Sequence, residues 1–416
     1  MKYELRDYQK SCIDKILWEK NAGLEGNSIC VLPTAAGKSL IIAELANVLN
    51  EPILILQPTR EITLQNYEKL SAYVPEEEIG IYSASLNSKE IKRYTLATIG
   101  SVFRRPEYFA HFGICIIDEC HLLSVNNLNG MFNKFFAKIN TIKEKTHELP
   151  IECVGLTATP FRLDNKYTAI PNGWYKSETT IKLINRMKGF FWQRILFNIG
   201  IAELQEMGYL CPLEYIDVSL IEHEDIPLNK SESDFDLDAY EDQISEKQKK
   251  ILETISYAAS ISKAVLVFCS SVRQATQLSE IVNNSAIITA TTPKKEREET
   301  IRAFKEGEIK TLLNVGIVNY GFDFPALDSV ILLRPTRSIG LFMQQCGRGL
   351  RIAKGKEKCH IFDLTSNVKN LGRVETIKLV KREKWELESE TCQYPDSWHN
   401  KTLYKFEFQK KLQQLL

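Results

Sequence analysis

Three groups of residues in this chain have the types and the spacing that phosphate chemistry requires. The first is PTAAGKS at residues 33–39, the second is DECH at residues 118–121, and the third is QQCGRGLR at residues 344–351. A lysine behind a loop of small residues, two adjacent carboxylates and two arginines are together the groups needed to bind and hydrolyse a nucleoside triphosphate. Each group alone could arise by chance, but their order along one chain indicates a nucleotide-driven enzyme.

The segment PTAAGKS follows an apolar run and precedes a helical pattern, which is the context of a phosphate-binding loop. Backbone N–H groups at the start of such a helix can surround phosphates, with Lys38 at the β- and γ-phosphates and the Ser39 hydroxyl on Mg²⁺. The general pattern has a glycine where this chain has Leu32 or Pro33, so a helix start without a ligand is the alternative. The predicted ATP-binding residues of this loop are Pro33, Thr34, Ala35, Ala36, Gly37, Lys38 and Ser39.

The pair Asp118 and Glu119 ends the apolar run that begins at Ile114. Sheets of parallel strands carry their chemistry at the carboxyl ends of the strands. Asp118 is therefore predicted to hold Mg²⁺ together with Ser39, and Glu119 to orient and deprotonate the attacking water. An acidic turn is the alternative for this pair taken alone. The neighbouring His121 is predicted to couple hydrolysis to movement.

Gln344, Arg348 and Arg351 recur at spacings of four and three residues, which places them on one face of a helix. Two arginines and an amide suit the negative charge of a phosphoryl-transfer transition state, and a basic helix surface is the alternative. They would complete the site only when two lobes close on the nucleotide. The predicted catalytic residues are Lys38, Asp118, Glu119, Gln344, Arg348 and Arg351.

Short apolar runs alternate with helical patterns in both halves of the chain, as in parallel sheets that are covered on both faces. Helices are expected from the phosphate loop through Asn50 and over residues 61–73. The expected strands are residues 28–32, 52–56, 94–99, 114–117 and 152–156 in the first half, and 264–269, 286–289, 311–315, 329–333 and 360–364 in the second.

Two segments depart from this alternation. Residues 222–248 are rich in Asp and Glu and are expected to form a solvated loop or an acidic linker, and the charged, aromatic tail is expected to form a helical cap. We expect a first domain over residues 1–204, a second domain over residues 205–370 that includes the acidic insertion, and an extension over residues 371–416.

The composition is that of an ordinary globular protein, with 416 residues, 44% hydrophobic residues and a formal net charge of zero. Any contact with nucleic acid must therefore come from a local basic track. The 10 cysteines form no Cys-x-x-Cys pair, which argues against zinc and against a disulfide framework and favours a reducing cytoplasm. No run of 18 apolar residues and no signal peptide is found.

Further segments complete a known pattern. They are LRDYQ at 5–9, QPTREITLQ at 57–65, TIGSV at 98–102, TAT at 157–159, VFCSS at 267–271 and NVGIVNYGFDFP at 314–325. With the three phosphate-handling groups, they make the chain resemble the superfamily 2 helicases of the DEAD/DEAH-box-like group, nearest to RadD-type and related phage-encoded DNA helicases. The resemblance runs from about Leu5 to Asp363 and implies an α/β fold of two tandem RecA-like parallel-sheet domains, with a nucleotide cleft between them and a short C-terminal extension.

The resemblance also implies roles for further residues. Arg6 and Gln9 would bind the adenine, and Thr157 and Thr159 would act with His121 in coupling. The implied nucleic-acid contacts are Thr59, Arg60, Gly100, Ser101, Ser270 and Asn319, and the implied nucleotide contacts of the second domain are Gly321 and Asp323.

The implied activity is ATP-dependent unwinding or remodelling of forked or branched DNA, with movement on single-stranded DNA, by a monomer that uses ATP and Mg²⁺ in a bacterial or phage-infected cytoplasm. Two departures from the family are visible. Ala35 replaces the usual glycine, and only Cys392 follows Cys359, where RadD carries a cysteine-rich zinc region.

Other functions remain open at this point. An RNA-directed DECH-box ATPase, an ATPase that remodels nucleic acid without unwinding, and the motor subunit of a restriction system use the same groups. Residues 185–194 interleave basic and aromatic side chains, so they either separate strands or form a helix that packs Phe190, Phe191 and Trp192 on the first domain.

Overall fold

The computed structural model describes residues 3–24, 26–123, 129–170, 174–186, 191–230, 233–317, 323–391 and 402–408. The chain divides into two compact units, each of which is described by itself. Unit 1 comprises Met1–Phe161 and Leu183–Ile199, and unit 2 comprises Arg162–Lys182 and Gly200–Leu416. The expected domain bounds at residues 204 and 370 stay predictions.

An eight-stranded sheet forms the centre of unit 1, and its neighbouring strands run parallel except for the pair β3 and β4. The parallel strands are nearly all apolar and buried, as expected for a sheet covered on both faces. In sheet order the strands are β10 (Trp192–Asn198), β1 (Asn27–Val31), β7 (Glu152–Thr157), β6 (Ile114–Asp118), β2 (Ile53–Gln57), β5 (Tyr94–Thr98), β3 (Ile79–Ser83) and β4 (Ser88–Lys89).

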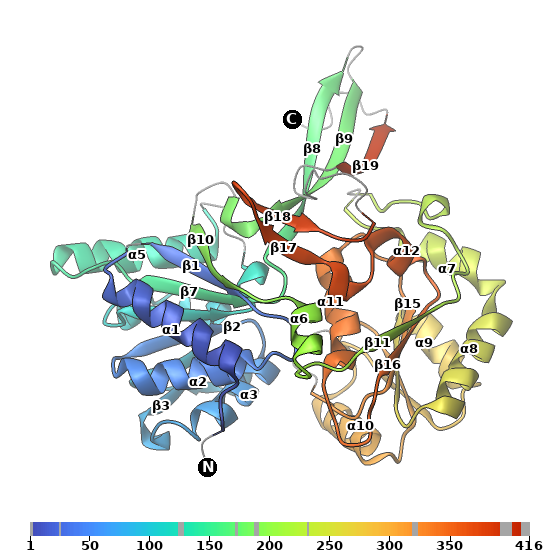
Figure 1. Cartoon of the computed structure of the whole chain (residues 1–416), viewed down its shortest axis with the longest axis horizontal. Helices are drawn as coiled ribbons and strands as arrows, with labels where there is room; N and C mark the ends of the chain where they lie inside the picture. The colour runs from blue at the N-terminus through green and yellow to red at the C-terminus, as the bar shows by residue number, and fades with distance from the viewer. Residues whose placement is uncertain are drawn as a thin grey trace. The chain divides into compact units, whose positions relative to one another are not determined.

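Two groups of helices cover this sheet. In the first group, α1 packs against α2, and α2 packs against α3; in the second, α5 packs against α4 and the short helix η3. Figure 1 shows the first group gathered together, apart from α5. The helices are α1 (Asp7–Asn21), α2 (Lys38–Leu49), α3 (Arg60–Leu70), α4 (Ile99–Val102) and α5 (Met131–Lys145), with short 3₁₀ helices η1 (Glu76–Glu78), η2 (Ala84–Leu86), η3 (Pro106–Phe109), η4 (Cys120–Leu122) and η6 (Ile184–Arg186).

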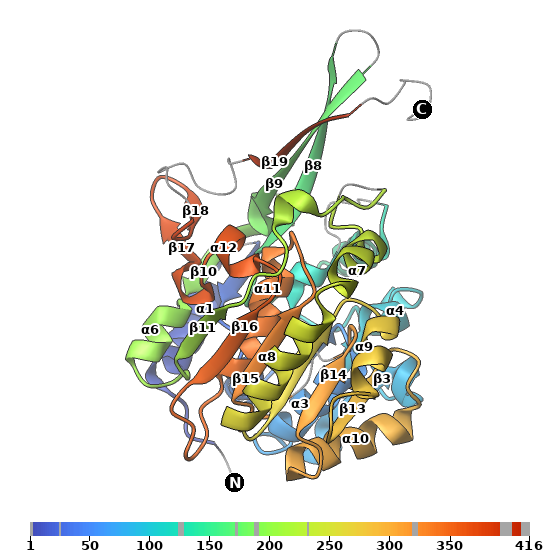
Figure 2. The ribbon, with the colours of Figure 1, turned by 90° about the vertical axis from the view of Figure 1, so that its right-hand side faces the viewer.

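A six-stranded, fully parallel sheet forms the centre of unit 2. In sheet order its strands are β11 (Leu213–Asp217), β16 (Cys359–Asp363), β15 (Ser329–Leu333), β12 (Val265–Cys269), β14 (Thr311–Asn314) and β13 (Ser285–Ile288). Its helices are α6 (Ile201–Glu206), α7 (Leu237–Ser245), α8 (Gln248–Ile261), α9 (Val272–Ser279), α10 (Lys294–Glu306), α11 (Ile339–Cys346) and α12 (Asn367–Leu371), with η7 (His223–Asp225), η8 (Gly347–Leu350) and η9 (Val374–Thr376). Figure 2 shows α8 and α9 over one face of this sheet.

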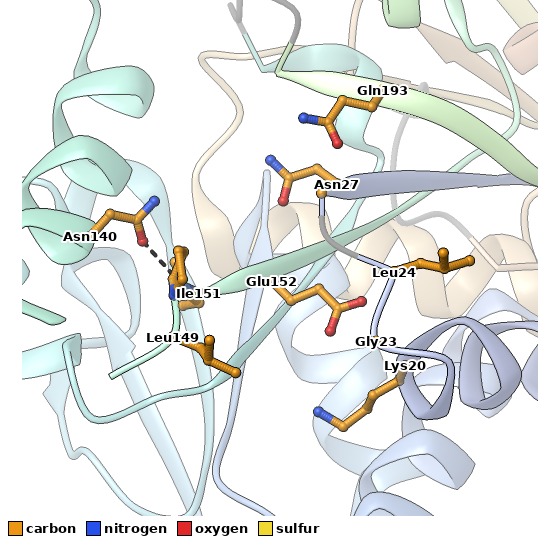
Figure 3. A pocket seen from close by; sticks show the side chains of 11 residues that line it. Lys20, Gly23, Leu24, Asn27, Asn140, Leu149, Ile151, Glu152 and Gln193 are labelled. Carbon is orange, nitrogen blue, oxygen red and sulfur yellow. Dashed lines mark hydrogen bonds between the residues drawn. The ribbon is translucent and has the colours of Figure 1, made fainter. Parts of the chain in front are cut away.

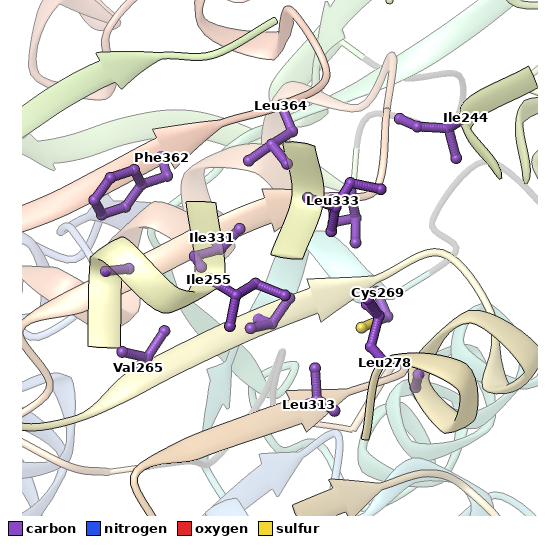
Figure 4. Close-up of a cluster of buried hydrophobic side chains, with 14 of the residues drawn as sticks. Ile244, Ile255, Val265, Cys269, Leu278, Leu313, Ile331, Leu333, Phe362 and Leu364 are labelled. Atoms are coloured by element: carbon purple, nitrogen blue, oxygen red, sulfur yellow. The ribbon is translucent and has the colours of Figure 1, made fainter. Parts of the chain in front are cut away.

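The acidic segment 222–248 contributes to the core of unit 2, so its prediction as a solvated loop or linker was wrong. Phe235, Tyr240 and Ile244 are buried in one cluster with side chains of α8 and β12. Figure 4 shows this cluster, with Ile244 at one end and Ile255 of α8 above the strands. Tyr240 and Ile244 are four residues apart and therefore share the inner face of α7. The segment is therefore rich in acidic residues but buries several of its apolar residues in the core of unit 2.

The C-terminal tail forms strands, so its prediction as a helical cap was wrong. β17 (Lys378–Lys381) pairs antiparallel with β18 (Trp385–Glu388), and Leu379 and Leu387 lie opposite each other and are buried. The period-two alternation of apolar and charged residues in WELE, the sequence of β18, is the sequence signal for this pair. A further sheet contains β8 (Phe161–Ile170), β9 (Trp174–Leu183) and β19 (Thr402–Phe408).

In the described part of residues 185–194 the expected helix is not found. Asn185 and Arg186 end the short 3₁₀ helix η6, and Trp192 begins the edge strand β10. The expected packing of the aromatic residues on the first domain is confirmed for Phe191 and Trp192. Phe191 contacts Phe132 and Phe136 of α5, and Trp192 is fully buried beneath Gly155. Phe190 lies outside the described residues. In the part of the chain that the structure describes, no helix is long and apolar enough to cross a membrane.

Candidate nucleotide-binding and catalytic site

The phosphate-loop segment connects β1 to α2 at the carboxyl edge of the unit 1 sheet. Ala35 and Gly37 both have left-handed backbone conformations, with φ of 69° and 75°, and the N–H of Ala36 donates to the carbonyl of Pro33 at 3.2 Å. Left-handed residues within a turn let successive N–H groups point to one side and form an anion-binding concavity. The loop therefore has the backbone shape that the sequence pattern predicts for phosphate binding.

Ala35 differs from the family's glycine in conformation as well as in size. A left-handed conformation costs an L-residue roughly 1–2 kcal/mol, whereas glycine adopts it freely. Alanine therefore fits this position less well than glycine, because φ at Ala35 is 69°. The loop carries local strain that a glycine would remove.

Residues near the N-terminus support this loop from one side. The Gln9 side chain donates to the carbonyl of Ala36 at 3.0 Å, and the Tyr8 hydroxyl donates to the same carbonyl at 2.8 Å. The Gln9 side-chain oxygen accepts from the backbone N–H of Arg6 at 2.9 Å. Gln9 thus ties the first turn of α1 to the loop, and the adenine contacts of Arg6 and Gln9 stay predictions.

The acidic pair lies beside the lysine of the loop. Lys38 Nζ is 3.3 Å from Glu119 Oε1, and both side chains are mostly buried. The other oxygen of Glu119 is 3.4 Å from His121 Nδ1, which in turn is 2.8 Å from the Thr157 hydroxyl. Glu119 has a left-handed backbone, with φ of 47°, directly after the last residue of β6. This conformation turns the chain so that Glu119 lies between Lys38 and His121.

Asp118 is a buried carboxylate that is hydrogen-bonded to neutral groups. Its oxygens accept hydrogen bonds from Asn66 Nδ2 at 3.1 Å and from the N–H of Glu119 at 2.9 Å. Burial and the neighbouring Glu119 charge raise the pKa of Asp118 to about 6, although Lys38 acts in the opposite direction. A divalent cation would offset both effects, so the residues present fit a magnesium nucleotide with Ser39 and Asp118 as the predicted ligands.

The predicted coupling residues lie together in unit 1. Thr157 is the last residue of β7, and its hydroxyl contacts His121 and also accepts from the N–H of Thr159 at 3.0 Å. Thr157 and Thr159 are fully buried. A continuous series of contacts therefore runs from Lys38 through Glu119 and His121 to the end of β7.

Sequence reasoning missed Asn66 and Tyr8. Asn66 lies on α3 and is 1% exposed, although an amide in the middle of a charged helix is normally on the surface. The signal that could have found it is its spacing of four residues from both Ile62 and Leu70, the apolar residues of the inner face of α3. Asn66 links the predicted nucleic-acid helix to the predicted metal ligand.

The predicted nucleic-acid residues of unit 1 follow β2 and β5 at the same edge of the sheet. Thr59 caps α3 by accepting from the N–H of Ile62 at 3.3 Å, and Arg60 begins that helix. The Ser101 hydroxyl accepts from the N–H of Ala84 at 3.0 Å, and a side chain at Gly100 would meet open space. Contact of these residues with nucleic acid stays a prediction.

In unit 2, Gln344 lies on α11 and Arg348 on η8, and both are buried. The predicted single helix face through Arg351 was wrong, because the α-helix ends at Cys346 and a 3₁₀ turn follows. The α-helix ends here because Gly347 and Gly349 have a low helix propensity. Arg351 Nε instead forms an ion pair with Asp323 Oδ1 at 2.5 Å.

Three further residues with predicted roles belong to unit 2. Asn319 and Gly321 lie outside the described residues. The hydroxyl of Ser270, predicted to contact nucleic acid, is buried and donates to Glu241 Oε1 at 2.8 Å. Ser270 therefore has an internal partner on α7.

A pocket of about 600 Å³ lies in unit 1 at the opposite edge of the sheet from the phosphate loop. Its lining includes Asn27 and Glu152, the first residues of β1 and β7, whereas the predicted site follows the last residues of these strands. Figure 3 shows Glu152 and Lys20 there, with the Asn140 side chain accepting from the N–H of Ile151. This pocket is not part of the predicted catalytic site.

Comparisons with known families agree with this geometry. Residues 2–162 match the family described as type III restriction enzyme, res subunit, and residues 246–353 match the helicase conserved C-terminal domain. The chain belongs to the superfamily 2 helicases of the DExH type. The narrower resemblance to the RadD type stays a prediction.

Several curated proteins are similar to this chain over most of its length. IRC3 of Saccharomyces cerevisiae, whose name carries the words ATP-dependent helicase, is 27% identical over 86% of this chain and 51% of its own. The DNA 3'-5' translocase XPB2 of Sulfurisphaera tokodaii is 26% identical over 86% of this chain and 80% of its own. The DNA 3'-5' helicase XPB of Mycobacterium tuberculosis is 24% identical over 85% and 58%. The chain spans only about half the length of IRC3.

Solved structures show the same fold of two RecA-like domains. The type ISP restriction-modification enzyme LlaBIII bound to DNA superposes with a TM-score of 0.59 at 14% identity, over 88% of this chain and 28% of that enzyme. The Pyrococcus furiosus Hef helicase domain superposes with a TM-score of 0.51 at 15% identity, over 87% and 96%. The expected fold class of two parallel-sheet, RecA-like units is thereby confirmed.

Proposed function

We propose that this helicase couples ATP hydrolysis to movement on single-stranded DNA and unwinds or remodels forked or branched DNA, as in repair or recombination. The observation that carries the proposal is the series of contacts from Lys38 through Glu119 and His121 to Thr157, with the buried Asp118 alongside. The names of XPB2 and XPB, which describe a DNA translocase and a DNA helicase, support DNA as the polymer.

Each residue of the series has a distinct part in this proposal. Lys38 and the N–H groups of its loop bind the phosphates, and Ser39 and Asp118 hold Mg²⁺, which neutralises phosphate charge when bound. Glu119 orients the attacking water and accepts its proton. In the structure Lys38 faces Glu119 at 3.3 Å, so Lys38 has to exchange this partner for phosphate before Glu119 is available as a base.

The site of unit 1 supplies binding and general-base chemistry, and the proposed contribution of unit 2 is charge stabilisation. Gln344 and Arg348 are the proposed groups, because a guanidinium stabilises the charge that develops during phosphoryl transfer. Residues of two separate units would then be required for one reaction, which would allow DNA binding to regulate hydrolysis.

The proposal is tested by steady-state ATP hydrolysis in the presence of single-stranded DNA. Lys38→Ala is expected to abolish both nucleotide binding and hydrolysis. Glu119→Gln is expected to lower kcat by roughly 100-fold or more while nucleotide still binds, since general-base catalysis contributes about 10²–10⁴-fold. Lys249→Ala and Glu61→Gln, which change exposed residues of α8 and α3, are the matched controls. Full activity of Lys38→Ala and Glu119→Gln would refute the assignment.

A further inference from the structure

The loop of residues 334–338 joins β15 to α11 and so determines where the helix that carries Gln344 begins. Thr336 and Arg337 in this loop are fully buried. A buried loop must find hydrogen-bond partners for its backbone, because it has lost those of water. The partners of this loop include Asp234 of the acidic segment 222–248, for which the proposed function has no role, and Asn367 of α12.

Asp234 of the acidic segment binds two consecutive residues of the loop. One carboxylate oxygen accepts from the backbone N–H of Arg337 at 2.8 Å, and the other accepts from the Thr336 hydroxyl at 3.1 Å. Hydrogen bonds to an ionised acceptor are stronger than those between neutral groups. The carboxylate therefore fixes both the backbone and a side chain of the loop.

The acidic segment holds this carboxylate in a defined place. The N–H of Asn229 donates to the carbonyl of Asp234 at 2.9 Å, and Leu228 pairs with Phe235 in an antiparallel bridge. Phe235 is buried in the core of unit 2, and Asp236 caps α7 by accepting from two backbone N–H groups. The position of Asp234 is thus fixed by its own backbone hydrogen bond to Asn229 and by the neighbouring Phe235, which is buried in the core.

A second contact from the same segment reaches the loop through Asn367. The Asn367 side-chain oxygen accepts from the N–H of Thr336 at 3.1 Å and from His223 Nε2 at 3.0 Å. The Asn367 amide nitrogen donates to the carbonyl of Arg334 at 3.1 Å. His223 is buried at the start of the acidic segment, so the segment supports the loop at two points, directly through Asp234 and indirectly through His223.

Hydrogen bonds connect this loop to the first turn of α11. The Thr336 hydroxyl accepts from the N–H of Ser338 at 3.0 Å, and the Ser338 hydroxyl caps α11 by accepting from the N–H of Leu341 at 3.2 Å. A capping hydroxyl fixes the first turn of a helix. The contacts therefore continue from Asp234 to the first turn of the helix that carries Gln344 and leads to Arg348.

We propose that the acidic segment is a positioning device for the arginine motif, with Asp234 as its principal residue and His223 as its second. Asp234 acts through Thr336 and Ser338 on α11, and so places Gln344 and Arg348 for hydrolysis. This inference rests on the proposed function, because Asp234 would affect ATP hydrolysis through the position of Gln344 and Arg348 and not by binding ATP itself.

The test is the variant Asp234→Asn, which keeps the shape of the side chain and removes its charge and one acceptor oxygen. We expect kcat for DNA-stimulated ATP hydrolysis to fall roughly 10-fold, since small displacements of reacting groups can cost up to about 10²-fold. The KM for ATP should change less than about two-fold, because the phosphate loop lies in unit 1. Glu224→Gln, an exposed acid of the same segment, is the matched control.

A merely structural role is distinguished by repeating Asp234→Asn in an Arg348→Ala background. If Asp234 acts through the arginine motif, the second change should cost less than about two-fold there, because residues that act as a unit are not additive. An equal 10-fold loss in both backgrounds, or wild-type kcat in Asp234→Asn, would overturn the inference. Thr336→Val, which removes the same hydroxyl contact, replaces Asp234→Asn if the latter does not fold. Absence of ATPase activity in the unmodified chain would instead refute the proposed function.

Discussion

Lys38 and Glu119 are the residues on which the predicted chemistry depends most directly, and their 3.3 Å contact shows that the fold alone brings them together. Their types and spacing were recognisable because phosphate chemistry restricts them strongly. Their shared contact with His121 and Thr157 was not derivable from spacing, since it depends on the left-handed backbone of Glu119 and on the adjacency of β6 and β7. Asn66 was missed because an amide on a charged helix is normally exposed, although its spacing from Ile62 and Leu70 places it on the inner face of α3.

Ala35 provides a prediction at this scale. Ala35→Gly should retain ATPase activity and raise the free energy of unfolding by up to about 1 kcal/mol, because glycine relieves the left-handed strain but gains flexibility in the unfolded chain. The measurement is urea unfolding monitored by tryptophan fluorescence.

The matched variant Gly37→Ala should lower the free energy of unfolding. Its backbone φ is 75°, and an added Cβ would lie 2.5 Å from the Gln9 amide nitrogen. Destabilisation by Ala35→Gly, with Gly37→Ala silent, would contradict the described loop conformation.

At the scale of elements, the central strands of both sheets were predictable because buried parallel strands are continuously apolar. β2 and β6, at ILILQ and ICIID, are examples. β11 was not predicted, because its residues are only partly buried and it has no apolar run. The acidic segment was misjudged because its charge count conceals Phe235, Tyr240 and Ile244. Local composition could not reveal that three residues spread over the segment share one core.

His223 provides a prediction at the scale of the acidic segment. Burial lowers the pKa of His223 to about 4, from an ordinary value near 6.5, even though the Asn367 contact acts in the opposite direction. The unfolded chain therefore binds a proton more readily, and the contribution of neutral His223 to stability is present above pH 6.5 and is lost as pH falls toward 4. The loss over this window is about 3 kcal/mol.

The measurement is the free energy of unfolding of the wild type and of His223→Gln between pH 7.5 and pH 4.5. Other titrating groups are common to both proteins, so their difference isolates His223. We expect the advantage of the wild type to shrink steadily below pH 6.5. An advantage that is independent of pH would show that His223 does not become charged on unfolding.

At the scale of the whole molecule, the two RecA-like units agree with the matches to the type III restriction enzyme res subunit and to the helicase conserved C-terminal domain, and they place the chain in superfamily 2. The formal net charge of zero provides no general attraction to nucleic acid, so binding must depend on particular residues rather than on bulk charge. The choice between DNA and RNA is not determined by composition or fold, because contacts to phosphates position a strand without reading it.

The most direct test is steady-state ATP hydrolysis by the unmodified chain with no polymer, with single-stranded DNA, with forked DNA and with duplex RNA, at one salt concentration. The account predicts low activity without polymer, stimulation by single-stranded DNA and the greatest stimulation by forked DNA, each abolished by Lys38→Ala. Stimulation by duplex RNA alone would contradict the assignment to DNA while leaving the ATPase site intact. No hydrolysis under any of these conditions would contradict the central claim.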